Sequence, residues 1–98
     1  MTIDELKDQV SKKAASIEPL GTTIKMVLDG NVIFIDGGGE ANIVSAEDNA
    51  ANCTITTDMA TLGEMMGGDL NPISAVMGGR VNIDGDMSAA MKLQEIFS

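Results

Sequence analysis

The chain has 98 residues, a formal net charge of −9, no histidine, one cysteine and two aromatic residues. This length allows one core, so we expect residues 1–98 to form a single domain. Without histidine, serine–histidine and cysteine–histidine mechanisms are excluded, and the commonest metal ligand is missing. Six basic residues against fifteen acidic ones argue against a nucleic-acid partner, because such binding depends on neutralising phosphates.

No segment has the length of a membrane span. The longest apolar stretch, residues 26–35, is interrupted at residues 29–31 and is far shorter than the roughly 20 residues that a spanning helix needs. Asp4 and Glu5 stand where a signal peptide would carry basic residues. A lone cysteine fits a reducing compartment. We therefore expect a cytoplasmic protein without stable membrane insertion.

The first predicted element is a helix that begins at Ile3, because Thr2 and Glu5 have the spacing of a capping box. Pro19 and Gly21 are expected to end it. Apolar β-branched runs follow at residues 22–28 and 32–36, and Asp29-Gly30-Asn31 between them predicts a hairpin in which Gly30 and Asn31 tolerate a positive φ.

Two more strands are expected at residues 41–46 and 53–56, separated by a polar, turn-rich connection. In the second of these, Cys53 and Ile55 alternate with threonines, which predicts one buried and one solvated face. The four strands together predict an antiparallel meander.

Helical periodicity returns after Thr57 and Asp58, either of which is suited to capping a helix that ends at Gly67. Asn71 and Pro72 predict the start of a short second helix. Its expected apolar face consists of Ile73, Val76 and Met77.

A fifth strand is predicted at residues 80–84, and Asp86 is expected to cap a last helix. The apolar surface of that helix should comprise Met87, Ala90, Met91, Leu93, Ile96 and Phe97. The predicted order is α-β-β-β-β-α-α-β-α. This is an α+β fold in which helices cover one face of a five-stranded, mostly antiparallel sheet.

No pattern predicts catalysis, a cofactor or a metal. The glycines at 37–39 lack the Lys-Ser/Thr that follows a phosphate-binding loop. Asn82, Asp84 and Asp86 begin like a calcium loop, but Met87 stands where that loop needs glycine. Cys53 is expected to be a buried, inert thiol. We therefore predict no catalytic residues, no metal, no cofactor and no enzymatic activity.

Methionine is unusually frequent, with eight residues in the chain. Six of the seven after the initiator fall on the predicted C-terminal helices, where aromatic residues are nearly absent. Flexible thioethers fill ordinary cores, and they also repack around variable apolar ligands. Composition alone leaves both interpretations open.

The stretch from Gly67 to Gln94 resembles the signature of the sterol carrier protein 2 (SCP2) family. A helix is followed by a Gly79-Arg80 turn, a strand that ends at Gly85-Asp86, and a Met-x-x-Ala-Met-Lys-Leu run from Met87 to Leu93. The resemblance implies an apolar tunnel that binds fatty acids, fatty acyl chains or sterol-like lipids without covalent chemistry.

By position, the resemblance also implies which residues contact the ligand. Gln94 is the polar side chain that it would bring to a ligand head group, and the other candidates are apolar: Ile24, Met26, Ile55, Ile83, Met87, Ala90 and Met91. The alternative is a structural or interaction module with a solid core. Such a module would form a homodimer or scaffold a partner enzyme of lipid or quinone biosynthesis.

Overall fold

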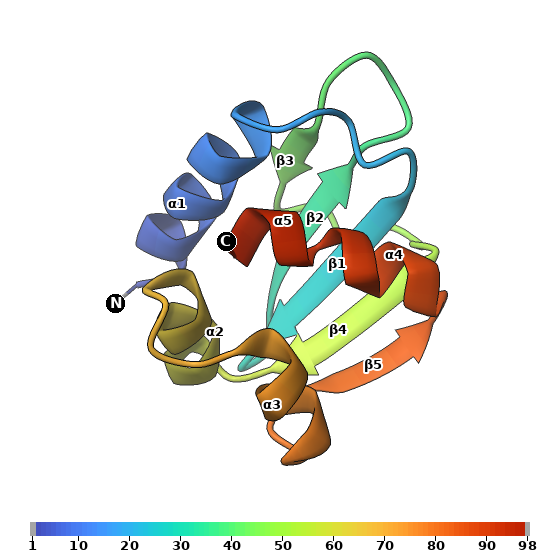
Figure 1. Ribbon diagram of the computed structural model, residues 1–98. Helices are drawn as coiled ribbons and strands as arrows, with labels where there is room; N and C mark the ends of the chain where they lie inside the picture. Colours follow the sequence, from blue (N-terminus) through green and yellow to red (C-terminus); the bar gives the residue numbers. More distant parts are fainter. Residues whose placement is uncertain (1, 98) are drawn as a thin grey trace.

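Helices cover one face of a five-stranded sheet (Figure 1). The computed structural model describes residues 2–97, with every side chain among them except those of Gln94 and Phe97. The predicted α+β fold is confirmed, although the last helix is divided in two. In chain order the elements are α1 (Ile3–Ala15), β1 (Thr23–Leu28), β2 (Asn31–Asp36), β3 (Ile43–Ser45), β4 (Cys53–Thr57), α2 (Met59–Met66), α3 (Pro72–Met77), β5 (Asn82–Gly85), α4 (Met87–Lys92) and α5 (Gln94–Phe97).

Helix α1 begins where the capping motif predicts. The Glu5 backbone N–H donates to Thr2 Oγ1 at 3.2 Å, and that hydroxyl donates to Glu5 Oε1 at 3.3 Å. The helix buries Leu6, Val10 and Ala14. These residues are four positions apart and form an apolar stripe along one side of the helix, through which it packs.

The predicted antiparallel meander is wrong, because the strand order is β3-β2-β1-β4-β5 and β4 pairs with β1 in parallel. The connection 46–52 therefore passes β2 and β1, from β3 at one edge of the sheet to β4 beyond them. On the sheet face opposite the helices, Lys25 Nζ lies 2.8 Å from Oδ1 of Asp48 in this connection. Alternation of apolar residues specifies which face is buried, but it does not specify which strand is the neighbour.

The hairpin between β1 and β2 forms as expected, with its turn one residue earlier. Leu28 pairs with Asn31, and the positive φ values belong to Asp29 (51°) and Gly30 (85°). Two residues with positive φ are typical of a type I′ turn, whose twist matches that of the strands. Asn31, expected to adopt positive φ, is instead the first residue of β2.

The caps predicted in the C-terminal half are present. Oδ1 of Asp58 accepts from the Thr61 N–H at 2.6 Å, Asn71 caps α3, and Asp86 caps α4. The predicted face of α3 is corrected, because Ile73 and Met77 are exposed and Ala75 is the buried residue. These caps fix where each helix starts beside the sheet.

The last helix is interrupted at Leu93, the C-cap of α4, so it is not the continuous element that its periodicity predicts. Leu93 at the break and Ile96 after it are both buried. Met87 and Met91, expected on the apolar surface of this helix, are exposed.

The core lies between the sheet and the helices. The alternating inward residues of β1, Ile24, Met26 and Leu28, are completely buried, and Ile33 and Ile35 of β2 continue this layer. Within residues 2–97, no helix combines the length and apolar character needed to cross a bilayer.

Candidate functional site

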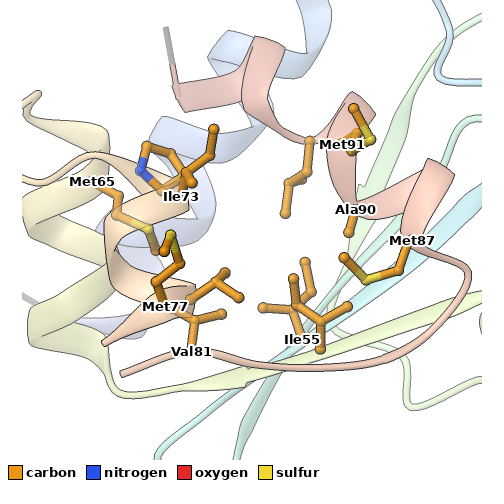
Figure 2. A pocket seen from close by; sticks show the side chains of 12 residues that line it. Ile55, Met65, Ile73, Met77, Val81, Met87, Ala90 and Met91 are labelled. Carbon is orange, nitrogen blue, oxygen red and sulfur yellow. The ribbon is translucent and has the colours of Figure 1, made fainter. Parts of the chain in front are cut away.

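An apolar cavity of about 270 Å³ lies between α3 and α4, over the β4–β5 end of the sheet (Figure 2). All of its twelve lining residues are apolar: Ile55, Met65, Pro72, Ile73, Val76, Met77, Val81, Ile83, Met87, Ala90, Met91 and Leu93. Ligand pockets commonly measure about 300–1,000 Å³, so this cavity has the size of a small ligand site.

The floor of the cavity comes from the sheet. Ile55 of β4 and Ile83 of β5 are directly paired across the ladder, and both lie on the face that the helices cover. Ile55 is 5% exposed. Figure 2 shows Ile55 below the gap, with Met87, Ala90 and Met91 of α4 on one side and Met77 and Val81 on the other.

Four large apolar side chains at the cavity are exposed, and we refer to them as the mouth: Ile73, Met77, Met87 and Met91. Met77 is 84% exposed and Met91 is 64% exposed. Fully burying a side chain of this kind contributes about 1.5–3 kcal/mol. An apolar ligand that covered the mouth would therefore gain free energy that the protein alone does not realise.

The space stays open because a small residue of α4 faces it and no described aromatic side chain fills it. That residue is Ala90, which is 9% exposed and lines the cavity. Of the two phenylalanines, Phe34 alternates with inward Ile33 and Ile35 and so points to the other face of the sheet. The side chain of Phe97 lies outside the described part of the chain.

Polar contacts fix the elements that frame the cavity. Arg80 Nη2 lies 2.7 Å from Oε2 of Glu64 and 3.0 Å from Oγ1 of Thr61, while the Thr57 hydroxyl donates to the Arg80 carbonyl at 2.9 Å. These bonds join α2, the end of β4 and the turn before β5. On the other side, Lys92 Nζ donates to the carbonyl of Leu20 at 3.0 Å and ties α4 to the segment before β1.

Two titratable groups beside these elements have shifted pKa values. Burial raises the pKa of the Cys53 thiol, and the charges of Asp86 and Asp84 raise it further. This fits the prediction of an unreactive thiol, because the thiolate is the nucleophilic form. The backbone N–H of Thr61, followed by its hydroxyl, lowers the pKa of Asp58.

The structure brings five of the predicted ligand contacts together around the cavity: Ile55, Ile83, Met87, Ala90 and Met91. Ile24 and Met26 are not among the lining residues, because they are fully buried in the packed core between the sheet and the helices. The side chain of Gln94 lies outside the described residues.

The prediction missed the wall that α2, α3 and the turn before β5 contribute: Met65, Pro72, Ile73, Val76, Met77 and Val81, together with Leu93. The apolar period of α3 predicts a face packed on the core, because periodicity alone does not distinguish such a face from a cavity wall. One signal pointed to them. Met65, Met77, Met87 and Met91 all line the cavity and belong to the methionine excess of the C-terminal helices.

The fold and the cavity define a small α+β domain with an apolar pocket at its side. Within residues 2–97, no group of histidine, cysteine, aspartate or glutamate side chains has an arrangement suited to a metal ion. The chain belongs to the SCP-2 sterol transfer family, whose model matches residues 3–98.

Known proteins similar to this chain include Sterol carrier protein 2 of Oryctolagus cuniculus, which is 40% identical over 58 residues. This match covers 59% of the chain but only 11% of the relative, so the chain spans a small part of the curated relatives that it matches.

Solved structures share the fold over nearly the whole chain. The crystal structure of Sterol Carrier Protein 2 Like 2 from Aedes aegypti has a TM-score of 0.78 and 15% identity, with 95% of this chain and 94% of that chain covered. The palmitated form of that protein in solution has a TM-score of 0.77 and 16% identity, covering 99% of this chain and 95% of the other. The UbiJ-SCP2 ubiquinone synthesis protein has a TM-score of 0.64 and 16% identity, with 95% and 77% covered.

Proposed function

We propose that this chain binds the hydrocarbon tail of an apolar lipid in the cavity between α3 and α4, and that it carries the lipid without catalysis. The observation that carries the proposal is a cavity of about 270 Å³ lined entirely by apolar side chains, four of which are exposed at its mouth. Membership of the SCP-2 sterol transfer family and the likeness to a palmitated protein support it.

The affinity depends on how much of the ligand's hydrocarbon tail the cavity can bury. Each buried methylene contributes about 0.8 kcal/mol, whereas association and ordering cost about 4–15 kcal/mol. A tail of about ten methylenes would therefore gain about 8 kcal/mol before these costs. Because the lining supplies no hydrogen bond, affinity must come from tail burial, and the methionines can adjust to tails of different shape.

The proposal is tested by titrating the protein with N-phenyl-1-naphthylamine, an uncharged fluorescent probe, and displacing it with long-chain alcohols. We expect the fluorescence of the probe to reach saturation and to fall when long-chain alcohols displace the probe. Ile55→Asp, which places a carboxylate on the cavity floor, should abolish the signal, whereas Ile43→Asp changes an exposed apolar residue on β3 and should retain it. Circular dichroism checks that both variants fold. Absence of saturable binding by the unchanged protein would refute the proposal.

The second candidate is a scaffold for a partner enzyme or a second copy of the chain, in which the exposed mouth is an interaction surface. The likeness to the UbiJ-SCP2 ubiquinone synthesis protein favours keeping this candidate. A ligand that enters the cavity should not change the mass of the protein in sedimentation. If the protein is instead a concentration-dependent dimer in which the probe no longer binds, the mouth serves association and the second candidate is preferred.

A further inference from the structure

The charged groups around the cavity determine which head groups its ligand can carry. This inference rests on the proposed function. All six basic side chains of the protein lie within the described residues, and none of them lines the cavity. A carboxylate bound there would therefore find no cationic partner in the cavity wall.

The two basic residues nearest to the lining in sequence are held elsewhere. Arg80 precedes Val81, but its guanidinium contacts Glu64 and Thr61 on α2. Lys92 lies between Met91 and Leu93, but its ammonium group is bonded to the carbonyl of Leu20. On the far face of the sheet, Lys25 is paired with Asp48. Recruiting Arg80 or Lys92 to a ligand would break contacts that hold the frame of the cavity.

An acidic side chain next to the mouth in sequence repels a carboxylate instead of attracting it. Asp86, the N-cap of α4, directly precedes Met87 of the mouth, and its Oδ1 accepts from the Ser88 N–H at 2.9 Å. It therefore already satisfies a donor at the start of this helix. The net charge of the whole chain is −9, and this charge repels an approaching anion.

We propose that this cavity selects amphiphiles whose head group carries no negative charge, and that it discriminates against free fatty-acid anions. A carboxylate drawn into the apolar cavity would be desolvated without a partner. If the carboxylate stayed in water, the tail would have to withdraw from the cavity. Withdrawal by about two methylenes costs about 1.6 kcal/mol, or about 15-fold in affinity.

The test compares undecanol with laurate, which share the undecyl tail, as competitors of N-phenyl-1-naphthylamine at neutral pH. We expect laurate to bind at least about tenfold more weakly than undecanol. Two variants at the mouth probe the cause. Met77→Lys introduces a cation at a position that is 84% exposed, and Met77→Gln removes the same apolar contact without adding charge.

The undecanol-to-laurate affinity ratio should be about two- to fivefold smaller in Met77→Lys than in Met77→Gln, as expected for an exposed ion pair. Raising the ionic strength should shrink that difference. Equal binding of laurate and undecanol by the unchanged protein would overturn the charge selectivity while leaving lipid binding intact. Failure of both ligands and of the probe would instead contradict the proposed function.

Discussion

Replacing Ala90 by leucine should make the protein more stable and its ligand binding weaker. Ala90 is 9% exposed, and Figure 2 shows its side chain directed into the space beside Ile55. A hollow at this position would accept the larger side chain without displacing its neighbours. A solid core would instead be overpacked, at a cost of about 1–3 kcal/mol. The sign of the stability change therefore distinguishes the two interpretations of this fold.

The magnitude follows from the added hydrocarbon. Exchanging a methyl group for an isobutyl group buries carbon worth about 2.4 kcal/mol, at about 0.8 kcal/mol per carbon. Ordering the longer side chain reduces this stabilisation by about 0.5–1 kcal/mol, and the slightly lower helix propensity of leucine reduces it by about 0.2 kcal/mol more. We expect a net gain of about 1 kcal/mol in the free energy of unfolding. In a domain of this size that raises Tm by about 4–8 °C.

Ligand affinity should fall because the leucine occupies space that the tail would fill. Loss of about 2.4 kcal/mol of tail burial corresponds to about 60-fold weaker binding. Denaturant unfolding measures the stability, and probe displacement measures the affinity. Ala89→Leu is the matched control, because Ala89 lies on the same helix, is 1% exposed and does not line the cavity. It should be destabilising, and a destabilised Ala90→Leu protein with unchanged affinity would refute the reasoning.

In a series of alcohols of increasing length, each extension by two methylenes should tighten Kd about 15-fold until the cavity is full, as calorimetry can measure; an affinity independent of length would contradict tail burial. Burial raises the pKa of Cys53, so at about pH 8 its reaction with a chromogenic disulfide should be slow until denaturant is added. Above this pH the folded state retains the thiol proton that the unfolded state loses, so the free energy of unfolding should fall as pH rises above about 8.5. Cys53→Ala should remove this pH dependence. A thiol that reacts equally fast in the folded and unfolded states would be inconsistent with the expectation. Asn71→Ala removes the side chain that accepts from the Ile73 and Ser74 N–H groups and should cost about 1 kcal/mol in thermal unfolding and weaken probe binding, because α3 forms a wall of the cavity; wild-type affinity at reduced stability would separate α3 from the site. Mild peroxide should oxidise the three exposed methionines of the mouth before the fully buried Met26, as peptide mass spectrometry resolves, and should lower affinity in proportion.

Local signals in the sequence were sufficient for the boundaries and the buried face of most elements. Thr2, Asp58 and Asn71 cap helices where their spacing predicts, since each satisfies backbone donors within a few residues. The alternation in β4 likewise identified Cys53 and Ile55 as buried. Such interactions are contained in short windows of sequence, and pattern analysis can therefore find them.

Features that depend on distant partners were not predictable in the same way. The parallel pairing of β4 with β1 depends on the route of the connection 46–52, which alternation does not encode. The break at Leu93 interrupts a helical pattern that continues on both sides. Ile73 and Met77 have the period of a buried stripe, yet they border an opening, because periodicity gives the same signal for a packed face and for a cavity wall.

We propose that a lipid tail occupies the space between α3 and α4, and isotope-labelled methionine methyl groups can detect it there. Nuclear Overhauser effects between these methyl groups and a bound alcohol report which methionines touch the tail. We expect contacts from Met65, Met77, Met87 and Met91, with none from Met26, which lies in the packed core. Contacts confined to Met26, or a bound ligand with no contact to any of the four, would contradict it.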